Sequence, residues 1–368
     1  MSILIFIFSL AILILVHEFG HFIVAKKSGI RVDEFGLGFP PKLWSKKWGG
    51  TLYTLNALPF GGFVKIFGED AHLPMSDIGQ NEKAVSFQYK PKWIQALVLV
   101  SGVMMNVIFA WFLISLGFMI GLPTPVEHDG FGAVTDAYVI VVDVLPLSPA
   151  EKAGLQMGDK ILSVKSESDV LQGPDLTKAN AQQFIRESKS KTIDITYSRG
   201  KASPATITIE PNADIVPNGQ AIGIAMDDIG ILKLPAHLAF IEGARTTGFL
   251  IKATAFGLGT FFGNAITLHA DFSQVSGPIG IASVVGEATS LGFVYLLSLV
   301  ALISINLAII NLLPFPALDG GRLLFVLIEA IIRQPIPTKI VQWTNMVGFA
   351  VLILLMIVVT GHDILKLV

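Results

Sequence analysis

The chain has 368 residues, of which 52% are hydrophobic and only 15% are charged. Soluble domains usually carry about 25% charged residues, so this composition favours a membrane protein with room for one soluble domain. The net charge of −2 gives no sign of a nucleic-acid partner, and the lack of cysteine excludes disulfides, thiolate metal sites and thiol nucleophiles. Any metal must therefore be bound by His, Asp or Glu.

The first apolar run covers residues 3–25 and stops at Lys26 and Lys27. This is long enough for a helix that spans a bilayer, which needs about 20 residues. A signal peptide is the competing interpretation, but it would have a basic start and a small-residue cleavage site, whereas here the charges follow the run. The pattern predicts a first transmembrane helix.

Residues 26–92 are mixed and basic, and within them residues 53–67 predict a β-hairpin. A strand at 54–58 is followed by a turn at 59–62 and a second strand at 63–67. The hairpin is apolar on both faces, so we expect it to be associated with the membrane. Its hypothesised role is to add an unwound substrate as an extra strand, with Phe60, Gly61 and Gly62 in contact with substrate. The alternative is a loop that rests on the membrane.

A second span is predicted at residues 94–120, and a polar region follows at 125–226. Short strand-like runs occur there at 138–144, 160–164, 193–197 and 205–209, and helical pieces lie near 149–153 and 179–187. This pattern predicts a small α+β domain.

Residues 235–270 contain Arg245 and Lys252 and predict an amphipathic helix on the membrane surface, with a true span as the alternative. A third span is expected at 293–313, with a break at Pro314, a helix that restarts at 323–332, and a fourth span at 341–359. The predicted organisation is an N-terminal membrane part (1–124), the α+β domain (125–226), a membrane-surface linker (227–291) and a C-terminal membrane part (292–368).

Basic residues are concentrated in the loops between spans one and two and between spans three and four. The positive-inside rule then places both loops in the cytoplasm, and both termini and the α+β domain outside. His17 lies roughly 13 Å of helix rise before Lys26, in the cytoplasmic half of span one. Asp319 follows span three on the same side. Two motifs about 300 residues apart thus reach a similar depth, toward the cytoplasm.

The sequence His17-Glu18-Phe19-Gly20-His21 matches H-E-x-x-H. Residues four apart share a helix face, so the two imidazoles can bind one Zn²⁺ while Glu18 takes a proton from water. The alternative is a helix end with polar residues packed against neighbours, but ionisable groups inside a span are costly without such compensation. We expect a zinc site with Glu18 as the catalytic base.

A catalytic zinc ion usually has three protein ligands, and Asp319 is the candidate for the third. Gly320 and Gly321 are expected to give the backbone freedom there, and the alternative for Asp319 is a helix N-cap. Asn311, Pro314 and Pro316 precede it and are predicted substrate contacts; for Asn311 the alternative is an interhelical hydrogen bond. In span two, Gly102 and Asn106 favour helix packing over catalysis.

These elements resemble the site-2 protease family, in its bacterial RseP-like branch. The resemblance rests on motifs at both ends of the chain: the H-E-x-x-H run, residues 60–65, Gly102 with Asn106, residues 275–280 (Val-Ser-Gly-Pro-Ile-Gly) and residues 311–321. It implies zinc ligation by His17, His21 and Asp319, a catalytic Glu18, and substrate contact at Asn311. It also implies four spans in a bacterial inner membrane, with both termini outside.

The α+β domain is similar to a bacterial PDZ domain, on the stretch from Ser148 to Leu162. The chain has one such domain, where well-known members of the branch carry two in tandem. Residues before Tyr138 lack a glycine-flanked loop to seat a peptide C-terminus, so the expected role is a size filter that keeps folded ectodomains away from the active site.

The sequence therefore predicts a polytopic α-helical membrane protein with an inserted extracytoplasmic PDZ-like domain and a membrane-associated hairpin. The predicted function is an intramembrane zinc endopeptidase that cuts transmembrane segments of single-span proteins. By resemblance, its substrates include anti-sigma factors and remnant signal peptides. One alternative is a non-catalytic PDZ scaffold with a structural metal, which needs a closed four-ligand site. Another is a metal transporter, which needs ionisable groups along several spans.

Overall fold

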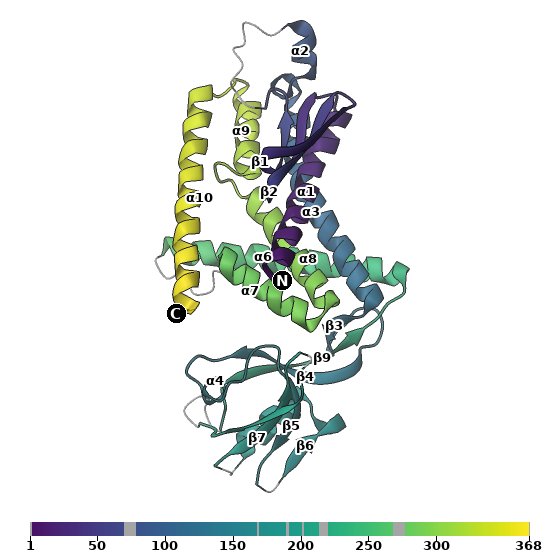
Figure 1. The fold of residues 1–368 in the computed structure, drawn as a ribbon, viewed down its shortest axis with the longest axis vertical. Helices are drawn as coiled ribbons and strands as arrows, with labels where there is room; N and C mark the ends of the chain where they lie inside the picture. The colour runs from purple at the N-terminus through teal and green to yellow at the C-terminus, as the bar shows by residue number, and fades with distance from the viewer. Residues whose placement is uncertain are drawn as a thin grey trace. The chain divides into compact units, whose positions relative to one another are not determined.

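The computed structural model describes residues 2–69, 79–167, 169–188, 191–200, 202–212, 220–267 and 277–367. Figure 1 shows the chain as a ribbon. It divides into two compact units, the first made of Met1–Ser115, Gly243–Thr289 and Leu296–Val368 and the second of Leu116–Glu242 and Ser290–Tyr295. The second unit includes the whole region in which the α+β domain is predicted.

Among the described residues, four helices are long and apolar enough to cross a membrane. They are α1 (Ser2–Lys27), α3 (Lys92–Ile120), α8 (Phe293–Leu312) and α10 (Thr338–Leu367). These helices coincide with the four predicted spans, so the membrane-protein class is confirmed. Helix α8 ends two residues before Pro314, because a proline disfavours helical conformation in the residue before it and cannot donate a backbone hydrogen bond.

Helix α6 (Ala236–Ile266) occupies most of the stretch for which an amphipathic helix is predicted. Its place on the membrane surface stays a prediction. A further helix, α7 (Pro278–Leu291), is not anticipated by the sequence pattern. The carboxylate of Asp363 in α10 accepts hydrogen bonds from the backbone N–H groups of Gly277 and Gly280, at 3.1 and 2.9 Å, and so caps the start of α7. Val275 and Ser276 of the family motif lie outside the described residues.

The predicted hairpin forms part of a larger sheet made by β1 (Val32–Trp48) and β2 (Thr51–Ile66). Residues 34–37 of β1 pair on one side with residues 62–65 and on the other with residues 52–55. The chain therefore reverses near residues 59–62, as expected. The two predicted strands do not pair with each other, however, because residues 34–37 lie between them. The sheet packs against α1 (Figure 1).

Helices α1 and α3 approach each other closely beside His17 and His21. A Cβ atom on Gly20 of α1 would overlap the carbonyl group of Ser101 in α3, so only glycine fits there. The short helices α2 (Gln80–Val85) and η1 (Phe87–Tyr89) precede α3, and α9 (Asp319–Ile332) follows α8. One apolar cluster joins α1, β1, β2, η1, α3 and α9: its buried members are Ala25, Ile30, Val32, Ile66, Phe87, Val98, Leu99 and Val326.

The second unit contains a sheet with the strand order β3-β9-β4-β5-β7-β8, and β6 pairs with β5. Its elements are β3 (Leu122–Pro125), β4 (Thr135–Val144), α4 (Pro149–Lys152), β5 (Lys160–Lys165), β6 (Val170–Gln172), η2 (Gly173–Asp175), α5 (Lys178–Glu187), β7 (Ile193–Ser198), β8 (Ala205–Ile209) and β9 (Ile224–Leu232). All four predicted strands and both predicted helical pieces are present. The sequence pattern misses β9, which lies inside the sheet.

The core of this unit follows from the periodicity of its strands and of α5. Ile193 and Ile195, two apart on β7, are fully buried, as expected for the inner face of a strand. Ala181 and Ile185, four apart, form the buried face of α5. The Thr177 side chain accepts a hydrogen bond from the N–H of Asn180 and caps that helix.

One ion pair, between residues that flank β5 and β7, has a buried carboxylate and can be tested. Asp159 is fully buried and accepts two hydrogen bonds from Arg199, at 2.7 and 2.8 Å, and a third from the N–H of Gln156 at 2.9 Å. Asp159→Ala leaves both donors without this acceptor. We expect amide hydrogen exchange in β5 and β7 of the full-length protein to accelerate roughly 10-fold, which corresponds to about 1.4 kcal/mol, because Arg199 stays hydrated when its partner is lost. Unchanged protection would contradict this, and Glu187→Ala, on the exposed face of α5, is the matched control.

Candidate metal centre

Helix α1 presents His17 and His21 on one face, one turn apart, because residues four apart lie above one another on a helix. Their side chains are almost fully buried, with 6% and 5% of each residue exposed. The two Nε2 atoms lie 3.2 Å apart. Both imidazoles thus point to a common position inside the first unit.

Asp319 reaches the same position from the other end of the chain. Its Oδ2 lies 2.9 Å from His17 Nε2 and 3.4 Å from His21 Nε2. The predicted convergence of the two motifs is therefore observed in the structure. Asp319 is the first residue of α9, and Leu318 occupies the N-cap position, so the alternative of an N-cap role for Asp319 does not apply.

Gly320 and Gly321 have a different role from the one expected. Neither has a positive φ, so backbone freedom is not what requires glycine here. A Cβ on Gly320 would overlap the carbonyl oxygen of Leu313, and one on Gly321 would overlap that of Phe315. The two glycines let the loop between α8 and α9 fold tightly against the start of α9, which directs Asp319 toward the histidines.

The other nitrogen of each imidazole also has a partner. His21 Nδ1 lies 2.8 Å from the carbonyl oxygen of Val98, a contact in which Nδ1–H donates and Nε2 stays free for a metal. His17 Nδ1 lies 3.2 Å from the amide of Asn106 in α3. Asn106 Oδ1 is buried and has no hydrogen-bond partner in the described part of the chain. A half-turn of this amide lets Oδ1 accept a bond from His17 Nδ1–H.

That arrangement satisfies the buried oxygen of Asn106 and frees His17 Nε2 for metal binding. Asn106 is thus a positioning residue for His17, although the sequence pattern favoured a packing role. Gly102, one turn earlier on α3, has a related role. A Cβ there would overlap His21 Nε2 and lie 2.8 Å from His17 Nε2, so glycine leaves the space that the imidazoles fill.

The geometry fits a zinc ion. Ligands at about 2.0–2.1 Å from a tetrahedral ion lie roughly 3.3 Å apart, close to the spacing of the three ligand atoms here. Within the described residues, His17, His21 and Asp319 form the one group of three or more such side chains. A carboxylate must be deprotonated to bind a metal, so Asp319 would bind the ion as an anion.

A cavity of about 210 Å³ adjoins two of the three candidate ligands, His17 and Asp319. Glu18 and Asn311 line it together with His17 and Asp319, so four predicted site residues meet at one space. The other lining residues are Ile14, Leu307, Ala317 and Leu318, which sequence analysis did not single out. Pro314 and Pro316 are not among them, and Pro316 instead packs against Gly348 of α10.

Phe60, Gly61 and Gly62 of the hairpin, which are predicted to contact the substrate, are not all beside the cavity. A Cβ on Gly62 would lie 3.5 Å from Ile14 and 3.6 Å from Cγ of Glu18, so the backbone of β2 passes directly beside the candidate base. Gly61, with a φ of 121°, faces the ring of Phe39 instead. The side chain of Phe60 lies outside the described part of the structure.

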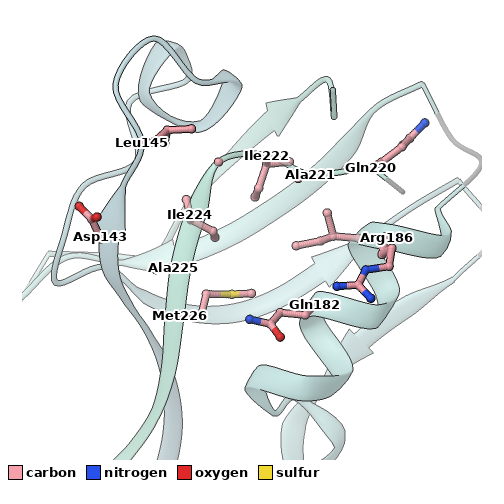
Figure 2. Close-up of a pocket in the computed structure, with 12 residues that line it drawn as sticks. Asp143, Leu145, Gln182, Arg186, Gln220, Ala221, Ile222, Ile224, Ala225 and Met226 are labelled. Carbon is pink, nitrogen blue, oxygen red and sulfur yellow. The ribbon is translucent and has the colours of Figure 1, made fainter. Parts of the chain in front are cut away.

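A second pocket, of about 340 Å³, lies within the second unit between α5 and the start of β9. Figure 2 shows Gln182 and Arg186 on the helix side and Ile224 and Met226 on the strand side. Residues 224–228 of β9 pair with β4 on one edge, and no ladder among the described residues pairs their other edge. Gly223, with a φ of 82°, provides the turn before β9. The sequence run Ile222-Gly223-Ile224 is the signal that could have located this loop.

The space at Gly102 generates a prediction about metal affinity. Gly102→Ala puts a methyl group where the imidazoles lie, so we expect the affinity for zinc to fall by at least 10-fold to 100-fold. Competition with a graded series of chelators, followed by measurement of retained zinc, checks this. The matched control on the same helix is Gly117→Ala, whose methyl group would meet the flexible end of Leu122. Equal zinc retention in the two variants would contradict the assignment.

Comparison with known proteins gives the same result as the geometry. The model of peptidase family M50 matches residues 5–355. A Clostridium perfringens protein whose name describes a zinc metalloprotease is 36% identical over 354 residues, covering 96% of this chain and 95% of that protein. Regulator of sigma-E protease RseP of Escherichia coli is 29% identical over 457 residues, covering 98% of both chains. Regulator of sigma-W protease RasP of Bacillus subtilis is 29% identical over 444 residues, covering 100% and 99%.

The resemblance to site-2 proteases is thereby confirmed at the level of the family, and zinc is confirmed as the cofactor. Together with the four apolar helices, these matches describe a zinc metalloprotease of the membrane. The chain belongs to peptidase family M50.

Proposed function

We propose that His17, His21 and Asp319 bind the zinc ion of this metalloprotease and that Glu18 is its general base. The observation that carries the proposal is the convergence of three ligand atoms within 3.4 Å of one another, with Glu18 lining the adjacent cavity. Zinc held there lowers the pKa of water and polarises a peptide carbonyl. Three protein ligands leave one position open for this chemistry, as catalytic sites require.

The residues of the chain then have separate roles in peptide hydrolysis. The carboxylate of Glu18 accepts a proton from the attacking water and returns it to the nitrogen of the leaving amine. The side-chain amide of Asn311, in the same cavity, donates a hydrogen bond to the carbonyl oxygen as negative charge develops on it. Asn106 and Val98 fix the orientation of the two histidines through their Nδ1 atoms.

The substrate in this proposal is the transmembrane segment of a single-span protein. The carbonyl groups of a helical segment are hydrogen-bonded within the helix, so the peptide must be held extended to be cut. Residues 62–65 of β2 support this step, because they pair with β1 on one edge and no ladder among the described residues pairs the other. A peptide that adds to this free edge would pass Gly62 and therefore Glu18.

The second unit is proposed to be an extracytoplasmic PDZ-like domain that keeps folded ectodomains away from the active site. The groove between α5 and the free edge of residues 224–228 also supports binding of an extended peptide. The names of two relatives connect them with sigma factors, which favours anti-sigma factors among the substrates, besides remnant signal peptides. We place the chain in the bacterial inner membrane, with both termini outside and the active site toward the cytoplasm.

Replacement of the base tests the proposed reaction. In Glu18→Gln, we expect cleavage of a tagged single-span reporter with a trimmed ectodomain to fall by about 100-fold to 10,000-fold, because the amide cannot accept the proton. Zinc content should equal that of the wild type, since Glu18 is not a ligand in this scheme. Equal cleavage by the two proteins at equal zinc content would exclude Glu18 as the base.

The contact between Gly62 and Glu18 tests the role of the sheet. Gly62→Val puts branched side-chain atoms against Ile14 and Glu18, and we expect cleavage to fall roughly 10-fold to 100-fold while zinc stays bound. The control is Gly79→Val, just before α2, where φ is −62° and an added Cβ meets nothing within 4 Å. Full activity of Gly62→Val would remove the sheet from substrate binding.

A further inference from the structure

The loop between α8 and α9 contains a residue with a strained backbone conformation, and this strain has no part in the proposed reaction. Ala317, two residues before Asp319, has a φ of 72°, in the left-handed region that non-glycine residues rarely adopt. Ala317 also lines the cavity together with His17 and Glu18. A strained residue in such a place persists only when its surroundings hold it.

Helix α10 provides some of the contacts that keep Ala317 in this conformation. The side-chain Oδ1 of Asn345 accepts a hydrogen bond from the backbone N–H of Ala317, at 3.3 Å. Three residues later on the same face of α10, Gly348 is buried against Pro316, and a Cβ there would lie 2.5 Å from Pro316 Cβ and 2.6 Å from its carbonyl oxygen. Two residues of α10 thus contact consecutive residues of the loop. Asn345 accepts a hydrogen bond from Ala317, and Gly348 packs closely against Pro316.

The position of Asn345 in its helix supports a structural role for this hydrogen bond. Asn345 belongs to a helix that is mainly apolar and long enough to span a membrane. An amide in such a helix is costly unless it makes a hydrogen bond. Its side-chain neighbours on the helix, Met346 and Val347, are exposed apolar residues, whereas Asn345 is half-buried against the loop.

We propose that Asn345 is a positioning residue for the metal centre: it holds Ala317 in the left-handed conformation and so fixes the direction from which Asp319 meets His17 and His21. The inference rests on the proposed zinc ligation by these three residues. It assigns to the fourth membrane helix, about 26 residues after Asp319 in the sequence, a role in the geometry of the site. Loss of the hydrogen bond lets the loop relax toward negative φ and displaces the carboxylate.

A double-mutant cycle tests the coupling between Asn345 and Ala317. Asn345→Leu keeps the size of the side chain but removes the acceptor, and we expect kcat for the single-span reporter to fall about 10-fold with KM nearly unchanged. Glycine adopts positive φ without help, so the same Asn345→Leu change should cost less than 2-fold in a chain that already carries Ala317→Gly. Thr344→Val, which removes a hydroxyl group that donates to the carbonyl oxygen of Ile340 in its own helix, is the control and should leave kcat unchanged.

A second readout does not depend on turnover. The visible absorption spectrum of the cobalt-substituted protein reports ligand geometry, and Asn345→Leu should change it at full cobalt occupancy, with Ala317→Gly in the same chain reversing the change. Gly348→Ala, which pushes on Pro316 by an independent contact, should change the spectrum in the same way. Asp319→Ala separates the two proposals, because an unchanged spectrum in that variant removes Asp319 from the metal site.

If the spectrum responds to Asp319→Ala but not to Asn345→Leu or Gly348→Ala, zinc ligation stands and the role of Asn345 is wrong. Equal loss of kcat from Asn345→Leu with and without Ala317→Gly would likewise overturn it, since the residue would then act by a route that does not involve the strained loop.

Discussion

Two imidazoles and a carboxylate lie within 3.4 Å of one another in a part of the molecule built mainly from apolar helices. Such groups are expensive to bury unless they are paired or bind a metal. In the proposed site, zinc would offset this cost because each of the three donor atoms would become a ligand. The other nitrogen of each imidazole has Val98 or Asn106 as its partner. Much of the first unit can be understood as the structure required to bring these three side chains together.

Glycine makes the approach possible at each point where backbone or imidazole must come close. Gly20 lets α1 pack on the carbonyl group of Ser101, and Gly102 leaves space for the imidazoles. Gly320 and Gly321 do the same for the loop before Asp319. Hydrogen bonds then fix the arrangement: Ser304 of α8 donates to the carbonyl oxygen of Asn106 at 2.8 Å, and Ala317 donates to Asn345 of α10. Five helices therefore contribute to the site, namely α1, α3, α8, α9 and α10, although the candidate ligands come from only α1 and α9.

The sequence predicts those parts of this arrangement that depend on residues close to one another in the chain. Apolar runs predicted four spans, and the spacing of His17 and His21 predicted a shared helix face, because both patterns depend on residues close in the chain. The pairing with Asp319 came from two motifs reaching one depth. Strands and helices of the second unit followed from alternation and helical periodicity in the same way.

The features that the sequence could not predict depend on contacts in space between residues that are far apart in the chain. Gly102 and Asn106 suggested packing, because nothing in α3 itself indicates that two histidines of α1 lie opposite. Gly320 and Gly321 suggested flexibility, whereas the carbonyl groups of Leu313 and Phe315 set the requirement. The predicted hairpin had the right reversal but the wrong pairing, because residues 34–37 insert between its strands. Strand β9, which follows Ile222 and Gly223, was missed because its partners in β4 lie 80 to 96 residues earlier in the chain.

The central claim is that two imidazoles and one carboxylate bind the zinc ion. X-ray absorption at the zinc edge on the purified full-length protein tests it most directly, because the scattering pattern counts imidazole ligands. The account predicts two imidazole nitrogens and light oxygen ligands at about 2.0–2.2 Å, with one imidazole lost in His21→Ala. A pattern with more than two imidazoles, or one that His21→Ala leaves unchanged, would contradict it.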